Sequence, residues 1–146
     1  MHSPETGILF LCVANSARSQ LAEAIARDLF HDSMRIQSAG SQPTRVRAEA
    51  TTVLNEVGLD TEGQRSTPVQ DVSSDQVDLV ITLCAEEVCP AFLGSAERLH
   101  WPLPDPASDD PSLDEEARLS RFREARDGLQ ARLEALGGTR GWLRDI

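Results

Sequence analysis

The chain has 146 residues, enough for one domain with a hydrophobic core. Hydrophobic residues make up 40% of it and charged residues 26%, as in soluble globular proteins, and no apolar run approaches the roughly 20 residues that span a membrane. The formal net charge of −10 argues against nucleic acid and anionic membranes as partners. We therefore expect a single domain over residues 1–146 that binds neither.

The cysteine count indicates the compartment. The N-terminal segment MHSPET has no basic region that leads into an apolar one, so no secretory signal is predicted. Three cysteines in such a chain indicate a reducing cytoplasm, and their odd number argues against a fixed disulfide framework. Cys84 and Cys89 have no second ligand pair, and the three histidines are scattered. We therefore predict no structural metal and no cofactor.

Strands and helices alternate in the first half of the chain. The apolar run Gly7–Val13 predicts a buried strand, and Leu21–Phe30 has helical spacing. Met34–Ser38 predicts a short second strand. A second helix is expected to open at Pro43–Thr44 and to stop at Gly58. Its inner face should carry Val46, Ala50, Val53, Leu54 and Val57.

The second half continues this alternation. Thr61–Asp75 is polar and turn-rich, which predicts a loop. Val77–Leu83 predicts a third buried strand, and Arg98–Leu103 predicts a fourth that prolines end. A candidate capping box over Ser112–Glu115 opens the last helix. That helix should run to Gly137–Gly138 with one apolar face formed by Phe122, Ala125, Leu129, Leu133 and Leu136.

This order of elements predicts an α/β fold of three layers, α/β/α, in which helices cover both faces of a parallel sheet. Ligands bind beyond the carboxyl ends of the strands in such folds. Cys12 stands at the carboxyl end of the first strand, Cys84 at that of the third, and Asp105 just past the fourth. We therefore expect three reactive side chains to meet at one edge of the sheet.

The segment between Cys12 and Arg18 has the character of an anion-binding loop. Its residues are small or polar, so their backbone N–H groups can surround a guest, and the helix that follows adds the positive end of its dipole. The Arg18 guanidinium suits two oxygens of a tetrahedral anion. The same donors would stabilise a Cys12 thiolate, and Ser19 can add a hydrogen bond to the sulfur. The predicted binding residues are Val13, Ala14, Asn15, Ser16, Ala17, Arg18 and Ser19.

A purely structural interpretation also exists for Cys12, Arg18, Asp105 and Asn15. Cys12 and Arg18 could also be a buried strand cysteine and an exposed helix arginine without a function, but the strand before them, Ser19 and the helix after them favour the anion-binding loop. Asp105 precedes a proline, where aspartate is common in turns. A loop position alone would explain a polar residue such as Asn15. Asparagine, however, also tolerates unusual backbone conformations better than most residues. We expect Asn15 to hold such a conformation.

Six stretches of the sequence resemble the low-molecular-weight protein tyrosine phosphatase superfamily and, within it, the thioredoxin-coupled arsenate reductases. They are FLCVANSARSQLAEA at 10–24, SAG at 38–40, EVGLD at 56–60, DLVITLC at 78–84, DPA at 105–107 and FREARDGL at 122–129. The resemblance implies a four-stranded parallel sheet in the order 2-1-3-4, with Cys12 and Cys84 on neighbouring strands. The additional pair Cys84 and Cys89 points to the reductase branch.

The resemblance implies reduction of arsenate to arsenite by a relay of three cysteines. The Cys12 thiolate attacks arsenic while Asp105 protonates the departing oxygen. Cys84 then attacks the Cys12 sulfur and arsenite leaves. Cys89 attacks Cys84 and frees Cys12. Thioredoxin reduces the resulting disulfide, and phosphate and sulfate are expected to compete with arsenate.

Two departures and two alternatives accompany this hypothesis. The reductases often have a further cysteine where this chain has Ala17. Some members bind potassium, for which Asn15 and Glu23 match but no matching aspartate occurs near Ser66–Pro68. Hydrolysis of phosphoesters would need only the loop and its acid, although Ala107-Ser108 replace the aromatic residues that usually follow Asp-Pro in phosphatases. An inactive anion sensor that docks a partner protein is the third possibility.

Overall fold

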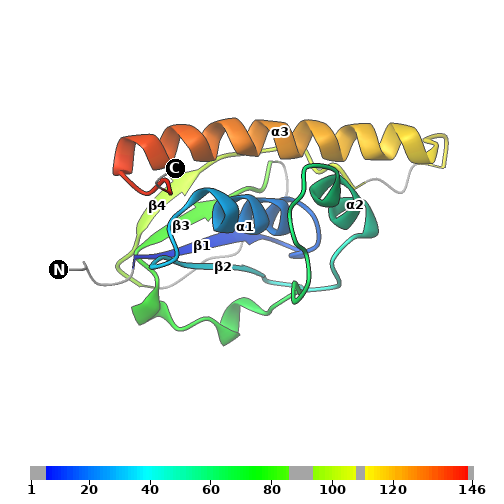
Figure 1. Ribbon diagram of the computed structural model, residues 1–146. Helices are drawn as coiled ribbons and strands as arrows, with labels where there is room; N and C mark the ends of the chain where they lie inside the picture. The colour runs from blue at the N-terminus through cyan, green and yellow to red at the C-terminus, as the bar shows by residue number, and fades with distance from the viewer. Residues whose placement is uncertain (1–5, 86–93, 108–110, 145–146) are drawn as a thin grey trace.

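The sheet of this computed structural model, which describes residues 6–85, 94–107 and 111–144, is entirely parallel (Figure 1). Its strands are β1 (Gly7–Cys12), β2 (Arg35–Gly40), β3 (Leu79–Thr82) and β4 (Glu97–His100). They pair in the order β2-β1-β3-β4, which confirms the predicted topology. All four carboxyl ends therefore lie at one edge of the sheet.

One face of the sheet is covered by the three α-helices of the described residues (Figure 1). They are α1 (Arg18–Leu29), α2 (Ala48–Glu56) and α3 (Glu115–Arg140). Their buried side chains form one hydrophobic cluster with the alternate β1 residues Ile8 and Phe10. This burial of apolar side chains is the main force that holds the helices on the sheet.

The opposite face of the sheet is covered, within the described residues, by short turns. Leu9 and Leu11 of β1 point to this side and pack in a second cluster with Val72. Two short 3-10 turns, η1 (Val69–Asp71) and η2 (Ser74–Gln76), lie beneath the sheet here (Figure 1). Within the described residues, turns rather than α-helices therefore form the third layer, because this stretch is too polar and turn-rich for a longer helix.

The second helix begins at Ala48 and not at Pro43–Thr44 as predicted. The residues before it are extended, and Arg47 has φ −71° and ψ 138°. Backbone N–H groups of this stretch donate to carbonyl oxygens of the loop after β1, which keeps the stretch out of helical geometry. Val57, expected on the inner face, is 51% exposed because it lies just past the end of α2.

The fourth strand begins one residue earlier and ends sooner than the predicted segment Arg98–Leu103. Regular pairing stops because Pro102 has no N–H group for the ladder. The chain nevertheless stays beside β3, since Leu103 N donates to Leu83 O at 3.1 Å. Asp105 is thereby held near the carboxyl edge of the sheet.

The last helix differs from the prediction at both ends. Its N-cap is Asp114, whose Oδ1 accepts from Ala117 N at 2.8 Å, so the capping box predicted to start at Ser112 is wrong. The helix continues through Gly137–Gly138 and ends at Gly141, which has φ 74°. A glycine adopts this left-handed conformation without strain, which explains why the helix stops there.

Position 137, inside α3, requires glycine because a side chain would not fit there. An added Cβ would lie 2.6 Å from Cε1 of Phe30 and 2.7 Å from Cδ2 of Leu143. Phe30 also stacks edge to face against Trp142, with ring centroids 5.7 Å apart. The close approach at Gly137 therefore lets the chain after α3 fold back onto the end of α1.

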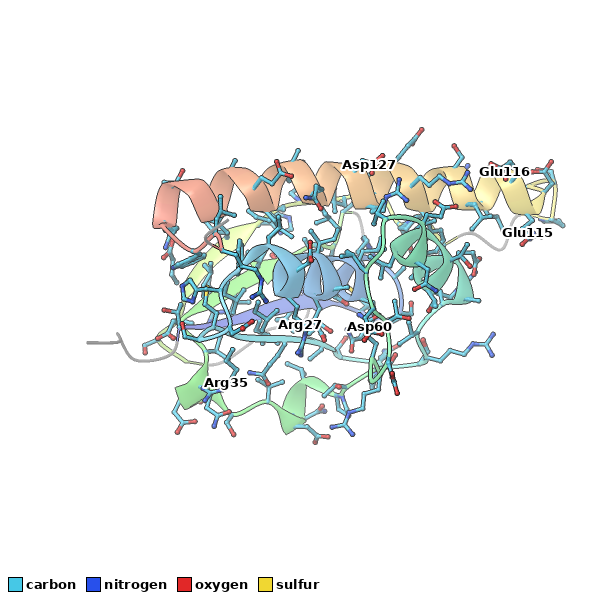
Figure 2. The ribbon with its side chains drawn as sticks, in the orientation of Figure 1. Arg27, Arg35, Asp60, Glu115, Glu116 and Asp127 are labelled. Atoms are coloured by element: carbon cyan, nitrogen blue, oxygen red, sulfur yellow. The ribbon has the colours of Figure 1, made fainter. Side chains whose placement is uncertain are left out.

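The outer side of α3 is charged. Figure 2 shows Glu115, Glu116 and Asp127 along this helix, and all three are exposed. No helix of the described residues is both long enough and apolar enough to cross a membrane.

We predict opposite effects for alanine at the two adjacent glycines of α3. Gly137→Ala should lower the free energy of unfolding by about 1–3 kcal/mol through overpacking against Phe30 and Leu143. Gly138→Ala is the matched control, because its nearest contact is 3.9 Å away, and it should raise stability by up to about 1 kcal/mol through helix propensity. Urea unfolding of both variants measures this, and equal effects would contradict the packing described here.

Candidate active site

The predicted reactive residues meet at the carboxyl edge of the sheet. Cys12 is the last residue of β1, and Cys84 follows β3 by two residues. Leu83 N donates to Leu11 O at 3.0 Å, so the chain that leads into Cys84 runs beside the end of β1. Both cysteines are buried, whereas 48% of the Asp105 side chain is exposed. Two buried cysteines therefore lie at the same edge of the sheet as a carboxyl group that reaches solvent.

The described cysteines differ in state. Cys12 has a free thiol, and Cys84 is disulfide-bonded. Cys89 lies outside the described residues. The Cys12 Sγ lies 2.9 Å from Oγ of Ser19, which is the contact that the sequence predicts. Of the two described cysteines, Cys12 is therefore the one with a thiol that a substrate bound at the loop could contact.

The loop of residues 13–17 turns its carbonyl groups outward. The carbonyl oxygens of Val13, Ala14 and Ser16 accept from backbone N–H groups in the segment 42–47, at 2.9, 3.1 and 2.9 Å. In the described part of the chain, no acceptor is bonded to the backbone N–H groups of residues 14–17. Successive N–H groups without an internal partner, next to a helix N-terminus, are the usual donors for an oxyanion.

Asn15 fixes the shape of this loop. It is fully buried, and its φ of 48° confirms the unusual backbone conformation that we predict for it. Its side-chain oxygen accepts from Thr67 N at 2.8 Å, and its Nδ2 donates to Oγ of Ser19 at 2.7 Å and Oγ of Ser38 at 3.0 Å. One amide therefore links the loop to α1, to β2 and to the segment before η1.

The contacts of Asn15 also orient the hydroxyl of Ser19. Because this hydroxyl oxygen accepts from Asn15 Nδ2, its own proton can be donated to the Cys12 sulfur 2.9 Å away. The buried polar chain from Asn15 through Ser19 thus ends on the Cys12 sulfur.

Gly40 lets the end of β2 approach the loop closely. A Cβ on this residue would lie 2.4 Å from Val13 O, 2.9 Å from Cys12 O and 3.0 Å from Asn15 N. Any side chain would therefore displace the loop backbone or the strand. This explains physically why glycine ends the SAG stretch.

Arg18 joins the loop to the other strands. It is 4% exposed, and its Nη1 donates to the carbonyl oxygens of Leu83 and Leu103 at 3.3 and 2.9 Å. Its Nη2 lies 3.8 Å from Oδ2 of Asp105. The guanidinium therefore places a positive charge at the ends of β3 and β4 and keeps the Asp105 carboxylate close to the loop.

An open pocket of about 520 Å³ adjoins the loop. It is lined by Ala14, Ser16, Thr44, Arg45, Arg47, Asp105 and Ala107. Arg47 Nη2 lies 3.1 Å from Oε2 of Glu49. Burial opposes ionisation of Glu49, but the hydrogen bond and charge of Arg47 outweigh it and hold the pKa of Glu49 below its ordinary value. The sequence did not predict Arg45 and Arg47 as site residues. The backbone hydrogen bonds that hold their segment against the loop join residues far apart in the sequence, so no local pattern indicates them.

The residues that match the potassium ligands of some relatives meet at Ser38. Ser38 Oγ donates to Glu23 Oε1 and accepts from Asn15 Nδ2. The Asn15 amide therefore turns its donor group to this point and uses its oxygen on Thr67 N, which does not suit a cation. Among the described residues there is no cluster of three His, Cys, Asp or Glu side chains that could hold a metal.

Comparisons with known proteins agree with this geometry. Residues 7–139 match the family described as low molecular weight phosphotyrosine protein phosphatase. An arsenate reductase of Halalkalibacterium halodurans is 35% identical over 134 residues, which cover 90% of this chain and 95% of the relative.

Solved structures extend the comparison. An arsenate reductase in the phosphate binding state has 31% identity and a TM-score of 0.74, over 92% of this chain and 98% of that one. A thioredoxin-dependent arsenate reductase of Corynebacterium glutamicum has 26% identity and a TM-score of 0.70, over 95% of this chain and 63% of that one. The chain therefore belongs to the low molecular weight phosphotyrosine protein phosphatase family, as its loop motif indicates, and the three relatives named above are arsenate reductases.

Proposed function

We propose that this protein reduces arsenate to arsenite in the cytoplasm, with thioredoxin as its reductant. The observation that carries the proposal is the loop of residues 14–17, whose N–H groups bond to no acceptor in the described residues and which adjoins the free thiol of Cys12. The arsenate reductases among the similar proteins support this choice of oxyanion.

In the first step the loop N–H groups and the N-terminus of α1 bind the arsenate oxygens, and Arg18 adds a positive charge at the loop. The Cys12 thiolate, hydrogen-bonded by Ser19, attacks arsenic, and an arsenic–oxygen bond breaks. Asp105 gives its proton to the departing oxygen, so a water leaves. Its exposure and its place in the lining of the pocket beside the loop support this role. Phosphate and sulfate have the same tetrahedral shape and should compete.

In the second step Cys84 attacks the Cys12 sulfur. A Cys12–Cys84 disulfide forms, the sulfur–arsenic bond breaks and its electron pair stays on arsenic, which falls from the +5 to the +3 state as arsenite. Neighbouring strands lie about 4.8 Å apart, within the Cα separation that a disulfide accepts, and the pairing of β1 with β3 supports this step.

In the last step Cys89 attacks Cys84, which returns Cys12 to the thiolate. Two electrons from the thioredoxin dithiol then reduce the Cys84–Cys89 disulfide. A Cys12 that is free while Cys84 is disulfide-bonded is the state expected after this exchange, and it supports the relay.

The proposal is tested by steady-state turnover. With thioredoxin, thioredoxin reductase and NADPH, added arsenate should cause continuous NADPH oxidation and accumulation of arsenite. Cys12→Ser should abolish this turnover and any hydrolysis of a phosphoester, because a serine hydroxyl is barely ionised in the loop. Hydrolysis without arsenate reduction by the unmodified protein would instead assign it to the phosphatases.

The two other cysteines should fail at different points of the relay. Cys89→Ser should complete about one turnover per molecule and then stop as a Cys12–Cys84 disulfide. Cys84→Ser should block arsenate reduction yet keep phosphoester hydrolysis, which needs only the loop and Asp105. Single-turnover arsenite release and mass spectrometry of the trapped disulfide measure both outcomes. Sustained thioredoxin-dependent turnover in either variant would refute the relay.

Asp105→Asn isolates the general acid. It should slow hydrolysis of a phosphoester with a poor leaving group by roughly 10²- to 10⁴-fold, since an amide cannot supply the proton. Asp75→Asn removes the same charge from an exposed position outside the pocket and should leave the rate unchanged. An unaffected Asp105→Asn variant would mean that another group protonates the leaving oxygen.

A further inference from the structure

The pocket beside the loop has to attract an anion to a protein that carries a net charge of −10. At long range such a field repels oxyanions, so the pocket needs local positive charge. Its lining contains two arginines, Arg45 and Arg47, in addition to Asp105. Arg18 lies deeper, at the loop itself.

The three arginines differ in how far their charges are already balanced. Arg18 lies 3.8 Å from Asp105, and Arg47 lies 3.1 Å from Glu49. Arg45 is exposed, and within the described part of the chain it makes no ion pair or hydrogen bond. Among the described residues, the charge of Arg45 is therefore the one at this pocket that no carboxylate offsets.

The backbone holds Arg45 in a fixed relation to the loop. Thr44 N donates to Ala14 O at 3.1 Å, and Arg47 N donates to Ser16 O at 2.9 Å. These two bonds lie on either side of Arg45 in the sequence. They hold its backbone against Ala14 and Ser16, whose N–H groups bond to no acceptor in the described residues. A flexible side chain on an anchored backbone can reach the pocket mouth without a loop movement.

We propose that Arg45 is an anion-binding residue of this pocket, which draws the oxyanion in and contacts it alongside the loop. The inference rests on the proposed function for its substrate, arsenate. Arg45 takes no part in the bonds that form or break, so its contribution should fall on binding and not on chemistry. It should also weaken as salt screens the charge.

Arg45→Gln tests this assignment. At low ionic strength the KM for arsenate should rise about 3- to 10-fold with kcat nearly constant, as for the loss of one favourable charge contact. The difference should shrink as sodium chloride is added, since the Debye length falls from about 10 Å at 0.1 M to about 3 Å at 1 M. Arg45→Lys should restore most of the affinity.

Arg132→Gln is the matched control, because it removes the same charge from an exposed position on α3 outside the pocket. It should leave the KM within the error of the unmodified protein. Equal KM values for Arg45→Gln and Arg132→Gln would overturn the proposal. So would a fall in kcat at unchanged KM.

Equilibrium binding separates this inference from the proposed function. Calorimetric titration with inorganic phosphate needs no turnover, and Arg45→Gln should weaken phosphate binding by the same 3- to 10-fold. Weaker phosphate binding in a protein that does not reduce arsenate would refute the proposed function but support the role of Arg45. Unchanged phosphate affinity in Arg45→Gln would overturn the inference whatever the substrate is.

Discussion

The site depends on one buried amide in a strained backbone position. Asn15 holds φ at 48° and bonds through its side chain to Thr67, Ser19 and Ser38. A non-glycine residue in this region costs of order 1–3 kcal/mol, which the three bonds must offset. The strain has a use: the loop turns its carbonyl groups outward and leaves the N–H groups of residues 14–17 for a ligand.

The sheet brings together side chains that lie far apart in the sequence. Parallel pairing in the order β2-β1-β3-β4 brings Cys12, Cys84 and Asp105 to one edge, although they are separated by up to 93 positions of chain between Cys12 and Asp105. Arg18 then joins the ends of β3 and β4 to the loop through Leu83 and Leu103. Backbone pairing thus positions the two cysteines and the carboxyl group, and a buried guanidinium contacts the ends of β3 and β4 beside them.

Local patterns in the sequence were sufficient for the order of the strands and for the conformation of Asn15. They also placed Cys12 at the end of β1 and Arg18 at the start of α1. They failed where distant residues decide the structure. The segment 42–47 is extended because it bonds to the loop, so α2 starts late and Arg45 reaches the pocket. Helix α3 passes through Gly137 because Phe30 and Leu143 pack against it. Hydrogen bonds and packing contacts between residues far apart in the sequence produce no periodic pattern along it, so local patterns do not predict them.

The central claim is that the N–H groups of residues 14–17 bind a tetrahedral oxyanion. Titration of the ¹⁵N-labelled, reduced protein with inorganic phosphate, followed by amide resonances in NMR spectra, tests it most directly. The account predicts that the amide signals of Ala14, Asn15, Ser16 and Ala17 shift the most and saturate together, with β2 nearly unchanged. Saturable shifts that leave these four amides unaffected would contradict it.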